Sequence, residues 1–309
     1  MTTPPSSTRR AAMAVGAATA AAVAGSIPGS RPARAATRPL DLETPEGNLD
    51  GYLKTRSDIG GKPSYTWASG MVYTHIPGRA SRTLMMGQAL NVTRCIKDAT
   101  GYQFLQRECL IWSDAATGEP LKTWFNPFID REVEVFHIQN ASVSSHYDIN
   151  GARGPYRMNY MEHSGDVTFY NDLFYKSASP LNIDEYPAYA AASDYQGAGL
   201  YHWHTRRADL DNADISSAPT TTSHIGVRQW LPWMEMGAWA GELVLPNRGK
   251  KLLGGVAEVP KAFRTWLEKN APEYLEPPSL EQKEERRSFY GEFKKHIDAK
   301  RALRAPGQK

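Results

Sequence analysis

Residues 83–126 read TLMMGQALNVTRCIKDATGYQFLQRECLIWSDAATGEPLKTWFN, and this stretch decides the predicted fold. Larger apolar residues alternate with smaller or polar ones along 83–96 and again along 102–112, as in strands with one buried face. Turn-forming sequences, Asp98-Ala99-Thr100-Gly101 and Ser113–Gly118, follow these two strands. The stretch therefore predicts two consecutive hairpins of an antiparallel meander.

The same pattern extends to both sides of this stretch. Further strands are expected near 65–73, 120–126, 132–138, 167–175, 200–206, 239–245 and 251–256. After them, Pro260 opens one predicted helix, and a Ser279–Gln282 capping box opens a second, highly charged one. We therefore predict a mainly β fold, an antiparallel meander forming a barrel or barrel-like sandwich, with C-terminal α-helices.

The first 35 residues have the three parts of an export signal. Arg9-Arg10 precedes the mildly apolar stretch Ala11–Gly25, and Ala33-Arg34-Ala35 fits the rule for cleavage before Ala36. Paired arginines before a weakly hydrophobic core are typical of the twin-arginine route. This predicts the twin-arginine export machinery as a partner and a periplasmic or secreted location. The expected organisation is a signal peptide at 1–35, a lead-in segment at 36–62, a β-rich core domain at 63–258, and a C-terminal helical strap and tail at 259–309.

Charge and hydropathy exclude two classes of partner. The chain has 36 Lys and Arg against 33 Asp and Glu, and four of those arginines lie in the first 35 residues. Cleavage of the signal would leave a nearly neutral protein, which argues against a nucleic-acid partner. No later apolar run approaches the ~18 residues that a membrane-spanning helix needs, so stable membrane insertion is not expected.

The hairpin register predicts a polar cluster on the buried face of the meander. A five-residue loop at 98–102 would place Arg94 opposite Gln106, with paired positions continuing along both strands. If the second loop pairs Trp112 with Pro120, one face collects Arg94, Gln106, Glu108, Trp124 and Asn126. A slip of one residue would separate these side chains.

An Arg94–Glu108 pair inside an apolar face has two interpretations, because buried charges are costly unless paired. It could be a structural ion pair that fixes the sheet. It could instead belong to a ligand cavity, with Glu108 as the catalytic acid–base, Arg94 opposing the effect of burial on Glu108, and Gln106 and Asn126 orienting a substrate oxygen. In that case Trp124 contributes to an aromatic wall.

The same register separates the two cysteines. Cys109 would face Asn91, four residues along the strand from Cys95, which corresponds to ~13 Å at ~3.3 Å per residue. A disulfide needs Cα atoms within about 7 Å. Two free thiols are therefore expected.

Residues 220–237, TTTSHIGVRQWLPWMEMG, form the densest apolar segment outside the meander. Trp230, Trp233 and Met234 surround a proline and form a rigid apolar surface, with the charged Arg228 beside it. This surface could be a core plug at one end of the barrel. We favour a lid or wall for an apolar or aromatic ligand, because Trp and Met suit irregular ligand shapes.

Histidines at 202 and 204 lie on one side of a predicted strand, a spacing that can chelate a metal, and His224 could add a third ligand. However, the Arg206-Arg207 pair would repel a cation, and no acidic residue stands at a familiar metal-site offset. Ordinary histidines are therefore favoured, and neither a metal nor a cofactor is predicted. The sequence also contains no nucleophile elbow, phosphate-binding loop or dinucleotide fingerprint.

Several spaced motifs resemble the family known as domain of unknown function 1838. They are GQALNVTR at 87–94, Arg107-Glu108, TGE at 117–119 with TWFNP at 123–127, and WLPWMEMG at 230–237. The resemblance covers residues 45–280 approximately. It implies no particular activity. His224 stands where the family pattern would have an aromatic residue.

Two functional hypotheses follow for an exported protein with an aromatic-lined cavity. The first is a cofactor-independent enzyme, an isomerase, lyase or hydrolase, acting on a small apolar or aromatic metabolite. The alternative is a lipocalin-like carrier that uses the same cavity without catalysis.

Overall fold

The computed structural model describes residues 39–149, 157–279 and 288–304. The chain divides into two units, Met1–Ala36 and Thr37–Lys309, and all described residues belong to the second. The predicted signal peptide at 1–35 lies outside the described residues, as does Gln282 of the predicted capping box.

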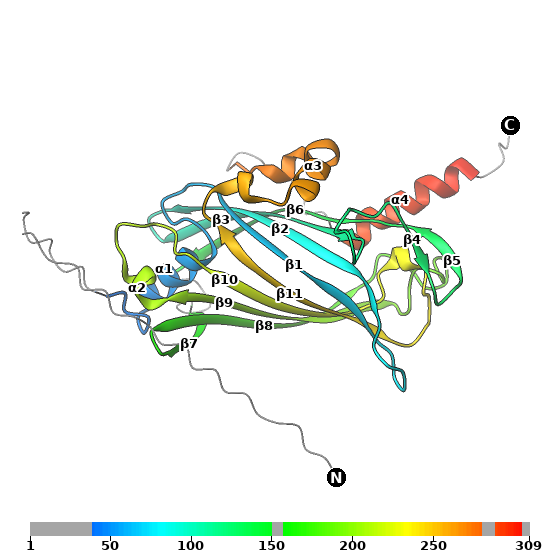
Figure 1. The fold of residues 1–309 in the computed structure, drawn as a ribbon, viewed down its shortest axis with the longest axis horizontal. Helices are drawn as coiled ribbons and strands as arrows, with labels where there is room; N and C mark the ends of the chain where they lie inside the picture. The colour runs from blue at the N-terminus through cyan, green and yellow to red at the C-terminus, as the bar shows by residue number, and fades with distance from the viewer. Residues whose placement is uncertain (1–38, 150–156, 280–287, 305–309) are drawn as a thin grey trace, which may run out of the picture. The chain divides into compact units, whose positions relative to one another are not determined.

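Nine strands form one antiparallel sheet in the order β6-β3-β2-β1-β11-β10-β9-β8-β7 (Figure 1). Their bounds are β1 Ser64–His75, β2 Thr83–Lys97, β3 Gly101–Ser113, β6 Ile138–Asp148, β7 Asn159–His163, β8 Asp166–Ala178, β9 Asp194–Arg206, β10 Thr221–Gln229 and β11 Glu242–Leu252. The first and last long strands pair with each other, for example at Tyr65 and Leu252. Most other neighbours are consecutive in the chain, as expected for a meander.

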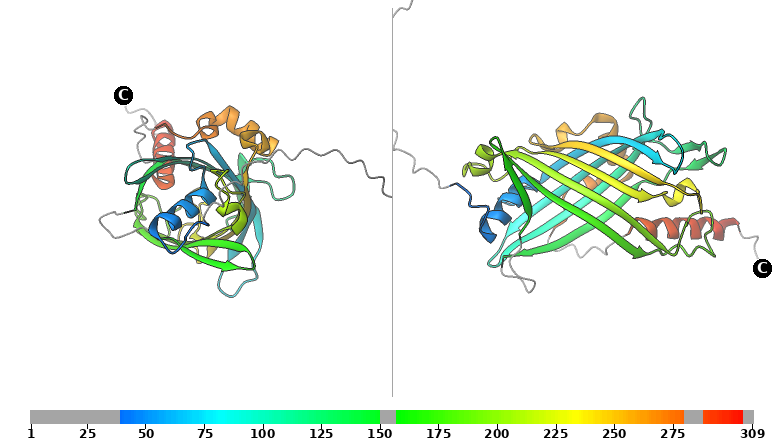
Figure 2. Two further views of the ribbon diagram at one scale, coloured as in Figure 1. Left: turned by 90° about the vertical axis from the view of Figure 1, so that its left-hand side faces the viewer. Right: turned by 90° about the horizontal axis from the view of Figure 1, so that it is seen from below.

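The mainly β, antiparallel character that the sequence predicts is confirmed. The sheet curves around the helix α1, Pro45–Arg56 (Figure 2). Within the described residues, however, its edge strands β6 and β7 do not pair with each other. A barrel closed by hydrogen bonds is therefore not formed, and a sandwich-like β fold describes the sheet better.

Helix α1 lies in the segment that the sequence analysis treated as a polar lead-in. Thr44 caps it by accepting a hydrogen bond from the backbone N–H of Gly47, and Pro45 occupies the first turn. Leu49, Tyr52 and Leu53 are buried in a cluster with residues from β2, β3, β8 and β9, including Cys95, Phe104, Phe169 and Trp203. Because the helix is covered on most sides, its sequence lacks the one-sided apolar pattern that would have revealed it.

The predicted C-terminal helices are confirmed where they can be described. Helix α3, Lys261–Asn270, begins directly after Pro260. Its Phe263 and Leu267 cover the outer face of the sheet at β2 and β3. Helix α4, Phe289–Arg304, packs Phe289 and Phe293 into a different cluster at the other end of the sheet. No helix in the described ranges is both long and apolar enough to cross a membrane.

The predicted register of the first hairpin is wrong by one residue. Arg94 pairs with Leu105 rather than Gln106, and Glu108 pairs with Asn91. The loop is shorter than expected, because Asp98 donates its backbone N–H to the carbonyl of Gly101 and accepts the N–H of Gly101 on its carboxylate. Since neighbouring side chains point to opposite faces, this slip moves Arg94 to the outer face of the sheet.

The second predicted hairpin is also different. Strand β4, Thr123–Asn126, pairs with β5, Arg131–Glu134, in a separate two-stranded sheet. The partner of β3 on that side is β6. Trp124 and Asn126 therefore do not face Glu108 and Gln106. The segment between β3 and β6, which contains β4 and β5, is joined to the end of β3 by a single β-bridge between Ser113 and Pro120.

The expected separation of the two cysteines is confirmed. Both are free and buried. Cys95 belongs to the cluster around α1, and Cys109 belongs to the cluster beneath α3, so the two thiols lie on opposite faces of the sheet. Burial raises the pKa of both thiols, that of Cys95 to about 12.

Candidate functional site

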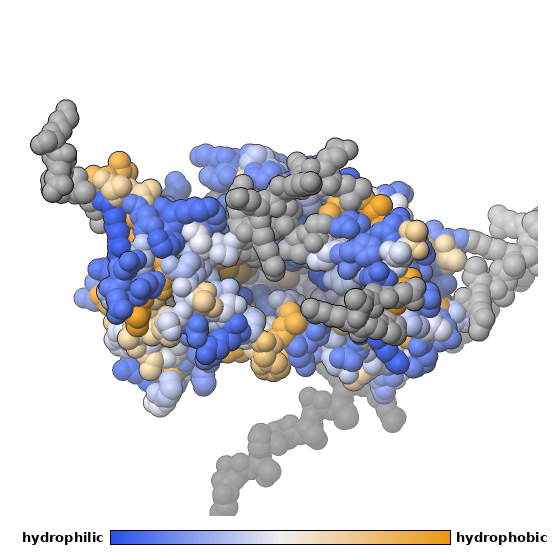
Figure 3. All heavy atoms as spheres, turned by 180° about the vertical axis from the view of Figure 1, so that it is seen from behind, coloured by the Kyte–Doolittle hydropathy of each residue, from blue (hydrophilic) through white to orange (hydrophobic). Residues whose placement is uncertain are grey.

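The inner face of the sheet encloses a cavity of about 870 Å³. Side chains alternate between the two faces of each strand, so only every second residue reaches the cavity. These are the odd-numbered residues of β2, β8, β9 and β11 and the even-numbered residues of β1, β3 and β10. Seen from behind, the surface is hollowed, and hydrophobic atoms stand at the edge of the hollow (Figure 3). The polar lining includes Arg56, Asn91, Gln106, Glu108, Tyr201, His224, Arg228 and Asn247.

Arg56, at the end of α1, organises the end of the cavity nearest the helix. Its guanidinium donates hydrogen bonds to the Tyr52 hydroxyl at 2.8 Å and to Gln106 Oε1 at 3.2 Å. It also lies over the rings of Phe104, at 4.9 Å, and Trp203, at 5.1 Å. These contacts compensate the half-buried charge and hold α1 against β3 and β9.

Gln106 is fixed from both sides. While its oxygen accepts from Arg56, its Nε2 donates to Asn91 Oδ1 at 2.6 Å. The predicted cavity position of Gln106 is therefore correct, although its partners are Arg56 and Asn91 instead of Arg94. Its amide is held by protein groups.

Glu108 also lines the cavity, as the sequence analysis predicted. Tyr201 of β9 lines the same cavity. Its pKa rises to about 12, chiefly because of burial and to a smaller extent because of the Glu108 carboxylate. Tyr201 is therefore a neutral phenol at physiological pH. The cavity thus presents one carboxylate and, within electrostatic range of it, a phenol that can donate a hydrogen bond.

His224 stacks on Tyr201, with ring centroids 4.3 Å apart. Burial, assisted by the nearby positive charge of Arg228, lowers the pKa of His224 to about 4. Its Nδ1 lies 3.5 Å from Asn247 Nδ2. The imidazole is therefore neutral at pH 7, and it provides aromatic surface together with one donor and one acceptor.

Arg228 stands four residues beyond His224 on the same face of β10. In the described chain its guanidinium has no ion pair and no hydrogen bond, and its Nε is buried without a partner. Gly226 lies between the two side chains, and a Cβ there would lie 3.5 Å from Arg228 Nη2 and 3.1 Å from His224 Cε1, so the glycine makes room for both side chains. Arg228 lines the cavity beside His224.

Aromatic residues from three elements form the wall near α4. Tyr290, at the start of α4, stacks on Tyr195 of β9 with ring centroids 4.3 Å apart. Burial raises the pKa of Tyr290 to about 12. Tyr175 of β8 and Leu231 complete this part of the lining.

A model of one protein family matches residues 61–297, and its description is protein of unknown function (DUF1838). The chain belongs to the DUF1838 family. This confirms the resemblance inferred from the motifs. The match includes every strand of the nine-stranded sheet, so the cavity lies largely within the family's domain. No curated protein matches the chain.

In this DUF1838 protein, the predicted partner of Glu108 is elsewhere. Arg94 lies on the outer face of β2, where its Nε is buried without a hydrogen-bond partner among the described residues. Its charge acts on Tyr65, which belongs to the cluster beneath α3. The predicted buried pair of Arg94 and Glu108 is therefore not formed.

The structure places Trp230, Trp233 and Met234 in the core, as in the alternative of a core plug, and not in the lining of the large cavity. All three residues are buried in one cluster with Trp112 and the α4 phenylalanines. Trp233 packs against Trp124 at 6.0 Å, and Asn126 Nδ2 donates to the Met234 carbonyl at 2.6 Å. These residues, Trp124 and Asn126 included, stabilise one end of the DUF1838 fold and do not line the cavity.

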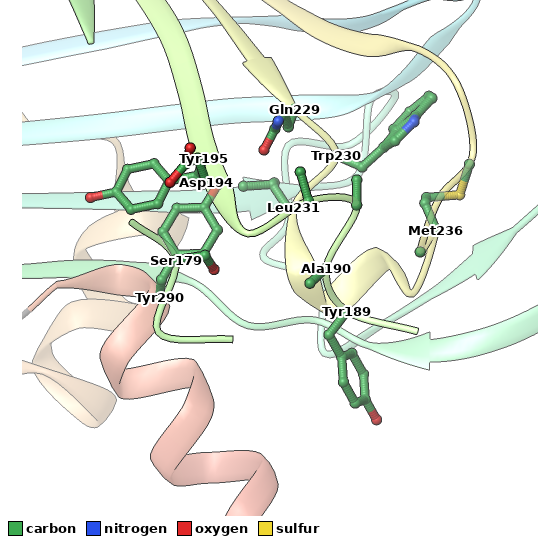
Figure 4. A pocket seen from close by; sticks show the side chains of 13 residues that line it. Ser179, Tyr189, Ala190, Asp194, Tyr195, Gln229, Trp230, Leu231, Met236 and Tyr290 are labelled. Carbon is green, nitrogen blue, oxygen red and sulfur yellow. The ribbon is translucent and has the colours of Figure 1, made fainter. Parts of the chain in front are cut away.

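A second pocket adjoins the cavity at this end (Figure 4). Trp230 and Met236 line it, together with Tyr195, Leu231 and Tyr290, which also line the large cavity. Its volume is about 10 Å³. This is space for about one water molecule, so the pocket is too small for an organic ligand.

The three histidines considered as metal ligands are separated by the sheet. His224 faces the cavity, whereas His202 and His204 occupy alternate positions of β9 that point outward. His204 Nδ1 lies 2.8 Å from Thr168 Oγ1 on the outer side. In the part of the chain that the structure describes, no group of three or more His, Cys, Asp or Glu side chains is arranged to hold a metal ion.

Sequence reasoning missed four of the cavity residues. Arg56 lies on the helix that was not predicted, and Asn91, Tyr201 and Asn247 were not singled out. One signal was present: along 195–203, Tyr195, Tyr201 and Trp203 fall on odd positions, which places their rings on one face of a strand.

Proposed function

We propose that this protein binds a small molecule with an aromatic or apolar body inside the curved sheet. The observation that carries the proposal is the cavity of about 870 Å³, a size in the usual range for small-molecule sites of ~300–1,000 Å³. Aromatic rings and a few separated polar groups line it, among them Tyr201, Trp203 and Tyr290. Such a lining suits a ligand with a ring and a small number of polar substituents.

Filling the cavity tests this proposal. Ala68 lies on the inner face of β1, so Ala68→Trp should occupy part of the space and weaken binding of a neutral naphthalene probe at least tenfold. Ala99→Trp, in the exposed first hairpin loop, is the matched control and should bind like the unaltered protein. Equal binding by both variants, at equal melting temperatures, would place the binding site elsewhere. Native mass spectrometry of protein from its own host would show whether a molecule is retained.

A second candidate function is catalysis in the same cavity without a cofactor. It is favoured by one observation, the presence of the Glu108 carboxylate and the neutral phenol of Tyr201 in the same lining. Glu108 would move a proton during an isomerisation, elimination or hydrolysis, and Tyr201 would donate a hydrogen bond to a substrate oxygen. Arg94 and Asn126 have no part in this version, since neither lines the cavity.

Glu108→Gln separates the enzyme from the carrier. An enzyme would lose turnover and keep its affinity for the ligand, whereas a carrier has no turnover of the co-purifying molecule to lose. Glu119→Gln, in the loop that follows β3, is an exposed control that should change neither property.

Export is the third part of the proposal. The paired arginines, the mild apolar stretch and the small-x-small sequence support a twin-arginine signal at 1–35 and a mature protein that acts in the periplasm or outside the cell.

A further inference from the structure

We propose that Arg228 binds an anionic group of the cavity ligand, so that the ligand is an organic anion whose carboxylate is attached to an aromatic or apolar body. This inference rests on the proposed function, since it assigns a chemical class to the molecule in the same cavity. It assigns to Arg228 a contact with the ligand itself.

The first argument is the unsatisfied state of the guanidinium. Arg228 is half-buried and always charged. Among the described residues no carboxylate lies within 4 Å of it and none accepts a hydrogen bond from it, and its Nε is buried. The other cavity arginine, Arg56, is compensated by two hydrogen bonds and by aromatic rings. A half-buried cation without partners is costly, and an anionic ligand would remove that cost.

The second argument is the place of Arg228 in the lining of the large cavity, beside aromatic side chains. Gly197 is its direct partner on the neighbouring strand β9, and Gly199 pairs with Gly226. A Cβ at these three glycines would meet the side chains of Tyr175, Tyr201 and His224 respectively, so the glycines make room for aromatic rings next to Arg228. The planar guanidinium matches the geometry of both oxygens of a carboxylate.

The third argument is the charge of the lining. Among its described members, Arg56 and Arg228 are cations and Glu108 is the one acidic side chain. His224 is neutral at pH 7, because burial lowers its pKa to about 4, and Tyr201 is neutral because burial raises its pKa to about 12. The described part of the lining thus has one more cation than acidic side chains, an excess that a monoanion would neutralise.

The apolar body of the ligand is placed by the aromatic side chains around Arg228. The positive charge of Arg228 acts on both Tyr201 and Tyr290, where it opposes the rise in pKa that burial causes. The guanidinium therefore lies within electrostatic range of two phenol rings. When the carboxylate of the ligand binds Arg228, the aromatic body of the ligand would lie against these two phenol rings.

The test compares two probes that differ only in charge, 2-naphthoate and 2-naphthamide, by titration calorimetry of the purified protein. We expect naphthoate to bind about tenfold or more tightly than naphthamide, as for a hydrogen bond to a charged group. Arg228→Gln should remove this preference and leave the affinity for naphthamide within about twofold. Arg248→Gln, on the exposed outer face of the adjacent strand β11, is the matched control and should keep the preference.

Each outcome bears on one claim. Equal affinity of the unaltered protein for the two probes would overturn the anion inference and leave the binding proposal standing. A preference that survives in folded Arg228→Gln would overturn the role of Arg228. Failure of both probes to bind would count against the proposed cavity function itself. The comparison in the unaltered protein decides the question even if Arg228→Gln does not fold.

Discussion

Arg94 and Glu108 lie on opposite faces of the hairpin formed by β2 and β3, because Arg94 pairs with Leu105 and Glu108 pairs with Asn91. One residue of register separates this arrangement from a buried ion pair. The difference has energetic consequences, since two charges on opposite faces of a sheet do not compensate each other.

The effects of Arg94→Met and Glu108→Gln on the free energy of unfolding should therefore add, within about 0.5 kcal/mol, in the double variant. Denaturant unfolding of the two single variants and the double variant measures this. Arg56→Met with Gln106→Leu is the positive control, because these side chains share a hydrogen bond and should be coupled. Coupling of about 1 kcal/mol or more between Arg94 and Glu108 would contradict the observed register.

Acidification should destabilise the protein through His224. Its pKa is about 4 in the folded state, below its usual value of 6.5, so the unfolded chain takes up this proton first as the pH falls. Stability is then lost between pH 6.5 and 4, by up to about 3 kcal/mol for this group. His224→Phe keeps an aromatic ring against Tyr201 and should flatten part of the pH profile of unfolding.

A part of that acid sensitivity should persist in His224→Phe. His137 accepts the backbone N–H of Trp112, and burial lowers its pKa to about 4 as well. His163→Phe, at the exposed end of β7, is the control and should leave the profile unchanged. An unaltered slope in His224→Phe would mean that this imidazole is accessible to protons in the folded protein.

Both thiols should be free but slow to react. Cys95 and Cys109 lie on opposite faces, and burial raises the pKa of each, so the reactive thiolate is scarce in the native protein. Alkylation without prior reduction should modify about two thiols after denaturation and very little before it. A denatured monomer with no reactive thiol would show a disulfide and refute the strand arrangement.

Replacing both arginines of the proposed signal by lysine, Arg9→Lys with Arg10→Lys, should leave uncleaved precursor in the cytoplasm. The reason is that the paired guanidinium groups are the recognised element of this route. Cell fractionation and N-terminal sequencing measure it, with Arg31→Lys as a control outside the pair. Normal appearance of protein that begins at Ala36 would refute the twin-arginine proposal.

The strands and the antiparallel class were predictable, because alternation and turn residues are local signals. The register was not, because the sequence Asp98-Ala99-Thr100-Gly101 indicates a turn without fixing the number of loop residues. The Asp98 carboxylate closes a shorter loop by accepting the N–H groups of Thr100 and Gly101. This contact decided on which face Arg94 would lie.

The composition of the site was predictable only in part. Gln106, Glu108 and Arg228 do line the cavity, whereas the tryptophans of the 230–237 segment do not, since an apolar surface in a sequence does not reveal whether protein or ligand covers it. Arg56 could not be found, because it reaches the cavity from a helix whose packing partners are distant in sequence.

The position of α1 also bears on the order in which the chain can fold. It is the first described element to be synthesised, yet Phe169 and Trp203 in its cluster come much later, and the strand after it pairs with β11. Such non-local contacts have a high entropic cost of closure and form slowly. The cluster around α1 therefore cannot be completed before Trp203 has been synthesised, and the sheet cannot be completed before β11. Export of this chain in the folded state, as the proposed signal at 1–35 implies, would have to wait until β11 has joined the sheet.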